Sequence, residues 1–450
     1  MMISHTFKES SSSGQQRSSS GMILRWLTLA LHMPDTLSPS PAVVTVNACK
    51  LTGSGLQRQS KLPPRHRPKG YEEGFDADTL WYDAIQKGYQ LYLMCPKLNN
   101  LASKIRSARW WVNKRQVDFQ RICFYRFHDV VELQLPIHMQ AQTLTVEIDS
   151  WLGSSNVAQP QPQFFAGLNT VVVMNKNNSL RWVSDFLCFH IHHHRLEGVI
   201  MMDNNSTSYD LADLADTICS TDLRQYLIIS APLKFGPYFL QLEKPYLLFN
   251  GEIFYVEQHL QTALLNSIQL RYLFKARAVL NCDIDELAYT PKTTIFDLAV
   301  RSPLGLVSLP VIWRYSNPVN PDPTQHAAHR LKHFALTCEP CHAKWCVDPS
   351  GLINRFPLSW NLHWLELEQH ERSTVLMFLS YRISHALNYI FKNVSLLLCR
   401  HAKFWHCRST TTGWKSGRKS TPPITQLIPD PECEAALNAV FSSSDSPVSS

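Results

Sequence analysis

Buried strands alternate with helices between residues 169 and 287, and this alternation constrains the fold more than any other feature of the sequence. "NTVVVMN", residues 169–175, is a continuous apolar run, as expected for a strand buried on both faces. "GVIMMDNNST", residues 198–207, and "YLIIS", residues 226–230, predict two further strands, and "ARAVLNCDIDEL" predicts a fourth. We therefore expect an α/β domain with a mostly parallel central sheet.

Helical patterns lie between these strands. Residues 179–196 and "SYDLADLADTI" have helical spacing, and "EIFYVEQHLQTALLNSIQLRYLF", residues 252–274, predicts one long helix. Beyond residue 306, "GLVSLPVIWRYS" predicts another strand and "SYRISHALNYIFKNV" another helix.

Changes in composition divide the chain of 450 residues into four parts. Residues 1–70 are rich in Ser, Pro and basic residues, which predicts a disordered N-terminal region. Residues 71–165 predict a small mixed α/β or β module that ends in the linker "AQPQPQ"; within it, "DTLWYDAIQKGYQLYLMC" has helical spacing and "QRICFYRFHDVVELQLPI" alternates like strands. Residues 166–405 form the α/β domain, and residues 406–450 predict a disordered tail.

Charge and cysteine content narrow the class of protein. A net charge of +7 is too small for a dedicated nucleic-acid binder. The 12 cysteines mostly stand alone in apolar runs, which is typical of reduced thiols and favours a cytoplasmic protein. The apolar stretch 21–33 is interrupted by Arg25 and is shorter than the roughly 20 residues of a membrane helix.

Three acids follow the fourth predicted strand. Asp283, Asp285 and Glu286 stand where that strand ends, and Asp203 ends the second strand. Neighbouring carboxylates repel one another unless a cation compensates them. Mg²⁺ and Mn²⁺ prefer oxygen ligands and often join a carboxylate to a substrate phosphate, so that a metal–diphosphate site is one interpretation. A solvated turn is the other.

The order of these motifs resembles that of a known family. The stretch 169–210, with Lys176-Asn177 and "DNNS" at 203–206, is similar to the opening of glycosyltransferases of the family 2-like and family 92-like group, which have a GT-A fold. "DIDE" at 283–286 is similar to their Asp-x-Asp-Glu, and "KWCVDPSGLINRFPLSWNLHW" and "SYRIS" are similar to their later segments. The resemblance covers about residues 168–395, but Asn178 stands where the group usually has Glu.

The resemblance implies roles for individual residues. It places the nucleotide sugar on Lys176, Asn177, Asp203, Asn205, Lys344 and Arg382. Mn²⁺ or Mg²⁺ is expected on Asp283 and Asp285, with His363 as a third ligand or an acceptor contact. For Lys344 and Arg382 the alternative is an ordinary position on the protein surface, and for His363 it is a position in the core.

The implied reaction is transfer of a hexose from a UDP- or GDP-sugar to the hydroxyl of a glycan or glycolipid precursor, with inversion. Such a reaction needs a general base, and Glu286, Asp322 and Asp348 are the candidates. An inactive, transferase-like module that binds carbohydrate or protein is the alternative.

Three other motifs have two interpretations each. "HIHHHR" places His190, His193 and His194 at helical spacing, as a metal face or as structural residues. Cys338, Cys341 and Cys346 fit either a zinc knuckle or a loop with free thiols. The basic run 400–419, with Trp405 and Trp414, fits a solvated tail or peripheral contact with an anionic membrane.

Overall fold

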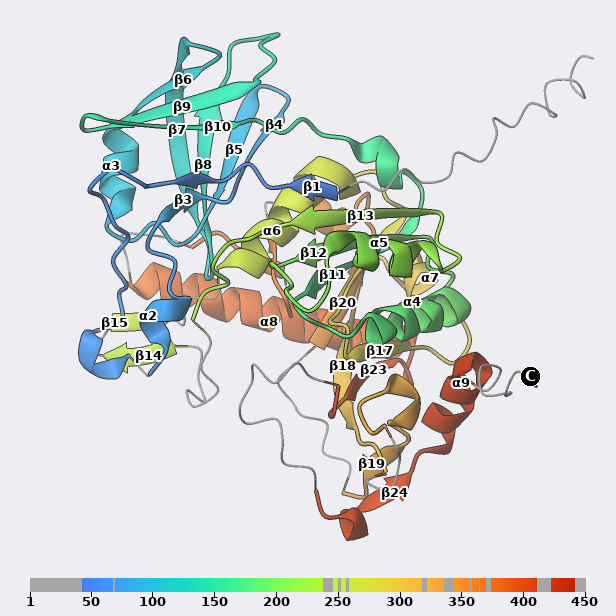
Figure 1. Ribbon diagram of the computed structural model, residues 1–450. Coiled ribbons are helices and arrows are strands. Elements are labelled where there is room, and N and C mark those ends of the chain that lie inside the picture. Colours follow the sequence, from blue (N-terminus) through green and yellow to red (C-terminus); the bar gives the residue numbers. More distant parts are fainter. Residues whose placement is uncertain are drawn as a thin grey trace, which may run out of the picture. The chain divides into compact units, whose positions relative to one another are not determined.

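The computed structural model describes residues 43–67, 69–237, 246–249, 252–255, 259–317, 322–335, 343–356, 358–363, 365–369, 374–410 and 422–441. It contains a nine-stranded mixed sheet and a seven-stranded antiparallel sheet, with helices packed against the first (Figure 1).

The nine-stranded sheet is parallel in one half only. Its strands in spatial order are β1 (Val43–Thr45), β13 (Gln225–Ser230), β12 (Gly198–Asp203), β11 (Asn169–Asn175), β16 (Ala278–Asn281), β20 (Ala343–Val347), β18 (Leu306–Arg314), β23 (Lys403–Cys407) and β17 (Glu286–Tyr289). All pairs from β1 to β16 are parallel, β20 is antiparallel to both of its neighbours, and β23 is parallel to β18 but antiparallel to β17.

The predicted GT-A fold with a mostly parallel sheet is therefore wrong. The apolar runs that predict parallel strands end with β16, whereas β20 and β23 carry buried polar side chains, Lys344 and His406, among their apolar ones. Strands of this kind do not read as continuous apolar runs, and the second half of the sheet is built from them.

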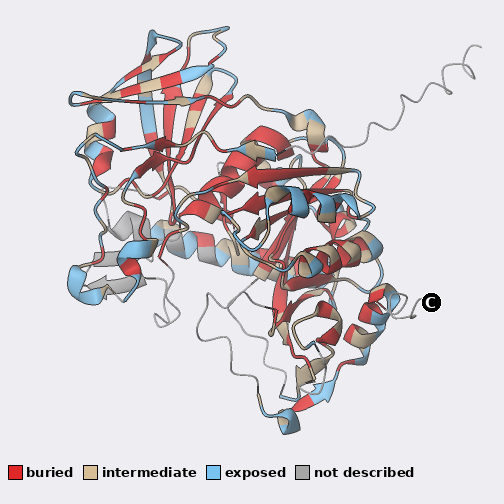
Figure 2. Ribbon diagram, viewed as in Figure 1, coloured by how far each residue is buried: buried red, intermediate tan, exposed pale blue. Residues whose placement is uncertain are grey.

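Two layers of helices cover the nine-stranded sheet. The helices α4 (Leu180–His194), α5 (Leu211–Cys219), α7 (Ile295–Arg301) and α9 (Pro431–Phe441) contribute to one apolar core. The helices α6 (Leu260–Ile268) and α8 (Thr374–Leu398) contribute to a second core, which also contains residues of the seven-stranded sheet. Figure 2 shows the strands buried between these layers.

The predicted strands at 169–175, 198–207 and 226–230 and the fourth, in "ARAVLNCDIDEL", are confirmed as β11, β12, β13 and β16, of which β12 ends at Asp203 and β16 at Asn281. The first two predicted helices are confirmed as α4 and α5. The single long helix expected over 252–274 is wrong, because β15 (Glu252–Tyr255) precedes α6 and a π-helical turn, Gln269–Leu273, follows it. β15 forms a hairpin with β14 (Tyr246–Phe249).

The seven-stranded sheet is made by residues 83–156. Its strands in spatial order are β10 (Trp151–Asn156), β9 (Thr143–Ile148), β6 (Arg109–Val112), β7 (Arg115–Phe124), β8 (Asp129–Gln134), β5 (Gln90–Cys95) and β4 (Asp83–Lys87). One face packs with the helix α3 (Leu101–Ser107) around the core that contains Leu91, Val131 and Val146.

The helix expected within "DTLWYDAIQKGYQLYLMC" is wrong. This stretch forms β3 (Thr79–Trp81), β4 and β5, in which long runs of consecutive residues are buried. Apolar residues at helical spacing also fit strands that are covered on both faces, so that periodicity does not separate the two.

Short elements lie in both segments for which composition predicts disorder. In the N-terminal segment β1 pairs with β13, and β2 (Cys49–Lys50) pairs with β3. In the C-terminal segment β24 (Leu427–Pro429) pairs with β19 (Leu331–His333), and α9 follows. The two remaining strands, β21 (Leu358–Trp360) and β22 (Leu365–Leu367), form a hairpin.

Across the described ranges, no helix combines the length and apolarity needed to cross a membrane.

Candidate functional site

Of the three predicted acids, Asp283 and Asp285 lie on the tight turn between β16 and β17, and Glu286 is the first residue of β17. The Asp283 amide donates to the Glu286 carboxylate (2.9 Å), and the Glu286 amide donates to the Asp283 carbonyl (3.0 Å). Exposure falls sharply across the turn, because the side chain of Asp283 is 34% exposed, that of Asp285 14% and that of Glu286 only 3%. The side chain of Asp283 is thus partly exposed, that of Asp285 is largely covered and that of Glu286 is buried.

Lys344 of β20 compensates the first and third acids. Its ammonium lies 2.9 Å from Asp283 and 3.2 Å from Glu286, and its side chain is 1% exposed. Burial by itself lowers the pKa of Lys344, but the two carboxylates outweigh it and raise the pKa. Burial raises the pKa of Glu286, and Lys344 opposes that rise. The ammonium of Lys344 is therefore paired with the carboxylates of Asp283 and Glu286.

His406 of β23 contacts the second acid. Its Nε2 lies 2.9 Å from Asp285, its Nδ1 lies 3.8 Å from Glu286, and its ring stacks on Trp313 at 4.0 Å. The register explains the contact, since Glu286 of β17 pairs with His406 and His406 with Trp313 of β18. We call Asp283, Asp285, Glu286, Lys344 and His406 the acid cluster.

Sequence reasoning missed His406, because it lies in a basic run 120 residues beyond Glu286 in which no motif points to it. The apolar residues of "KFWHC" were the available signal for a strand.

A buried pair lies beneath the turn. The His326 Nε2 donates to the Ile284 carbonyl (2.7 Å), between the two aspartates, and the His326 Nδ1 lies 4.0 Å from Asp185 of α4. Burial lowers the pKa of His326 and raises that of Asp185. The His326 ring thus holds the backbone of the turn at Ile284, next to the buried Asp185 of α4.

The predicted metal set of Asp283, Asp285 and His363 does not assemble. Within the described ranges no three His, Cys, Asp or Glu side chains are grouped so that they could hold a metal ion. The His363 Nδ1 lies 3.1 Å from the Ala343 carbonyl, at the start of β20. A Mg²⁺ or Mn²⁺ ion at Asp283 and Asp285 would therefore have two carboxylate ligands, and substrate phosphates or water would have to complete its shell.

Four of the six predicted nucleotide-binding residues, Lys176, Asn177, Asp203 and Asn205, form a second polar group, at the ends of β11 and β12. Asp203 is 2% exposed, and its carboxylate accepts from Asn175 Nδ2 (2.8 Å), the Ser206 amide (3.0 Å) and the Ser206 hydroxyl (2.5 Å). Its acceptor positions are thus used within the chain. Asp203 shapes the loop instead of facing solvent.

The loops that follow β11 and β12 are joined by side chains. The Asn177 Oδ1 accepts from the Thr207 amide (2.6 Å), and Lys176 Nζ lies 3.5 Å from Asn204 Oδ1. Asn177 and Asn205 have φ values of 53° and 56°, a left-handed conformation that Asn adopts more readily than most residues. Asn205 and Lys176 are exposed at this edge.

The remaining predicted residues are Asp348, Asp322 and Arg382. Asp348 follows Val347, which pairs with Val279 at the amino end of β16, so that Asp348 is at the edge of the sheet opposite to Asp283. Asp322 lies on an exposed turn and accepts from Thr324 Oγ1 (2.6 Å). Arg382 is exposed on α8.

The histidines of "HIHHHR" are structural. His190 Nε2 accepts from the Ala288 amide (3.2 Å), and His194 Nε2 donates to the Ala288 carbonyl (2.7 Å), so that two α4 residues hold β17. Of the predicted zinc ligands, Cys346 is buried in β20 as a free thiol, and Cys338 and Cys341 lie outside the described residues.

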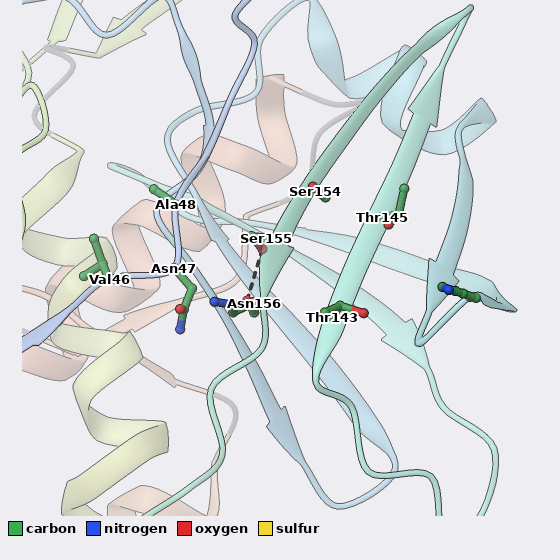
Figure 3. A pocket seen from close by; sticks show the side chains of 9 residues that line it. Val46, Asn47, Ala48, Thr143, Thr145, Ser154, Ser155 and Asn156 are labelled. Carbon is green, nitrogen blue, oxygen red and sulfur yellow. Dashed lines mark hydrogen bonds between the residues drawn. The ribbon is translucent and has the colours of Figure 1, made fainter.

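A pocket of about 540 Å³ lies apart from the acid cluster, where the linker between β1 and β2 passes β9 and β10 (Figure 3). Its lining residues are Val46, Asn47, Ala48, Lys114, Thr143, Thr145, Ser154, Ser155 and Asn156.

Comparison with family models and with curated proteins finds no match for this chain.

Proposed function

We propose that the acid cluster binds the diphosphate of a UDP- or GDP-sugar together with Mg²⁺ or Mn²⁺, and that the protein transfers the sugar to a hydroxyl acceptor on a glycan or lipid. The observation that carries the proposal is the pair Asp283 and Asp285, 34% and 14% exposed, on a turn held in place from inside. A bound cation supplies charge neutralisation for the departing diphosphate.

The residues of the chain have distinct parts in this proposal. Asp283 and Asp285 bind the cation, and Lys344 and His406 keep the two carboxylates in place. Glu286 is too buried to meet an acceptor hydroxyl and acts as a positioning residue between Lys344 and His406. The exposed Lys176 and Asn205 flank the same edge and offer donors and acceptors to the nucleotide.

The alternative, a binding module without catalysis, has one observation in its favour. The acids find their partners within the chain, since Lys344 pairs with Asp283 and Glu286, and His406 pairs with Asp285. A turn that is compensated in this way stays folded without a metal.

Donor binding can be tested by thermal unfolding with UDP, GDP and their sugars, each with and without Mn²⁺. A ligand that binds only the native state raises the apparent unfolding temperature, by a shift that corresponds to about 2.7 kcal/mol at 100 times the dissociation constant. We expect a shift that needs both the nucleotide and Mn²⁺. No shift for any nucleotide, in a chain that unfolds cooperatively, favours the binding module.

A further inference from the structure

The helix α8 exposes large apolar side chains between residues 379 and 398. The exposed fractions are 86% for Leu397, 66% for Tyr389, 52% for Ile390, 50% for Leu379, 44% for Leu398 and 43% for Ile383. We call these six residues the α8 patch. Exposed apolar residues that stand singly are normal, but a contiguous apolar patch marks an interaction surface.

The α8 patch follows the helical period. Leu379, Ile383, Ile390 and Leu397 are separated by four, seven and seven residues, and this spacing places them in one stripe along the helix. The opposite side holds the buried residues Ser384, Phe391 and Ser395, and the Ser395 hydroxyl accepts from the Ser308 amide of β18 (2.9 Å). The helix is thus buried on one side and exposed on the other, as Figure 2 shows for its described residues, and the exposed side carries the apolar stripe.

The helix itself carries charges of one sign. Residues 374–398 contain Arg382 and Lys392 but no Asp or Glu, and the exposed Arg400 and His401 follow the helix. Glu368 and Glu371 precede the helix in the sequence, and Glu368 pairs with Arg121 (3.3 Å). The exposed Arg382 lies beside the apolar stripe, whereas Lys392 lies on the other side of the helix. A stripe with one arginine beside it and another just after its end fits a surface that is apolar inside and anionic outside.

We propose that the α8 patch docks onto a membrane surface that contains anionic phospholipids, with the helix lying in the plane of the headgroups. Ile390 and Leu397 insert at the boundary between headgroups and acyl chains, and Tyr389 lies at the headgroup level. Arg382 and Arg400 contact the lipid phosphates. A second copy of α8 fits less well, because residues 374–398 contain two cations and no carboxylate to pair them across such an interface.

The proposed contact with the membrane is thus made mainly by α8, and not by the basic run 400–419 that the sequence suggests. Trp405, which the run 400–419 offers as a membrane anchor, is fully buried in β23, whereas Arg400 remains exposed. The proposal does not depend on sugar transfer, and it stands or falls separately from it.

Vesicle flotation with the full chain tests the proposal. Vesicles of phosphatidylcholine with about 30% phosphatidylserine are compared with vesicles of phosphatidylcholine alone. We expect binding to the anionic vesicles that weakens as salt is added, because salt screens the cations. Leu397→Glu and Arg382→Glu should each lower the partition coefficient about tenfold or more.

Matched controls separate the patch from general effects. Leu152→Glu changes a leucine that is 64% exposed on β10, and Lys114→Glu changes an exposed lysine in the β6–β7 turn, and both should bind as the wild type does. Equal binding by wild type and Leu397→Glu, or no binding to anionic vesicles, overturns the proposal. A dimer in sedimentation velocity that Leu397→Glu dissociates assigns the patch to a second copy and overturns it as well.

Discussion

Replacing Lys344 with methionine is expected to lower the free energy of unfolding by about 3–5 kcal/mol, the usual cost of leaving a buried charge without its partner. The substitution leaves Glu286, whose side chain is 3% exposed, and Asp283 on the same turn without their ammonium. Lys292→Met, at an exposed lysine beyond β17, is the matched control and should change stability by less than about 0.5 kcal/mol. Urea unfolding measures both.

The loss of stability in Lys344→Met should increase as the pH rises. Burial already raises the pKa of Glu286 above 4.5, and removal of Lys344 takes away the charge that opposes the rise. A carboxyl whose pKa is raised in the folded state favours folding at low pH and loses that contribution as pH increases. The difference between wild type and Lys344→Met should therefore grow from about pH 5 to pH 8.

A second substitution tests the cause. Adding Glu286→Gln to Lys344→Met removes both charges, and the double variant should recover part of the lost stability. If Lys344→Met is no less stable than Lys292→Met, or if the double variant is less stable than Lys344→Met, the lysine does not compensate the acids.

The second large effect is expected on donor binding. Asp285→Asn should weaken Mn²⁺-dependent binding of the nucleotide sugar by at least about 100-fold, because a metal ligand contributes several kcal/mol through the cation. The fold should be retained, since an amide can still accept from His406 at the position of the carboxylate. Isothermal titration with and without Mn²⁺ measures the change.

Asp348→Asn is the control for this prediction. The sequence proposes Asp348 as a general base, but it lies at the opposite edge of the sheet from the acid cluster. Its substitution should leave donor binding and turnover within about twofold. Equal losses in Asp285→Asn and Asp348→Asn contradict the assignment of the site to the β16–β17 turn.

The sequence predicts one half of the nine-stranded sheet well. β11, β12, β13 and β16 are covered on both faces, and such strands read as apolar runs. The seven-stranded sheet and the antiparallel half are harder, because Asp83 in β4, Lys344 in β20 and His406 in β23 are buried polar residues whose partners lie far along the chain. No local pattern reveals those partners.

The distance between partners along the chain also limits how much of the site can be predicted from the sequence. The three acids are visible as a motif, but what compensates them is not, since Lys344 follows Asp283 by 61 residues and His406 follows Asp285 by 121. Repulsion among acids predicts that some cation is present. The structure shows a lysine and a histidine in that position, and the pair Asp283–Asp285 on the exposed side of them.

Turnover tests the central claim most directly. The full chain is incubated with a panel of UDP- and GDP-sugars, with Mn²⁺, with Mg²⁺ and with a chelator, and release of the nucleotide is measured. The account predicts metal-dependent hydrolysis of at least one sugar nucleotide that Asp285→Asn abolishes. Folded protein that hydrolyses none of them, or that hydrolyses one equally well with the chelator present, contradicts it.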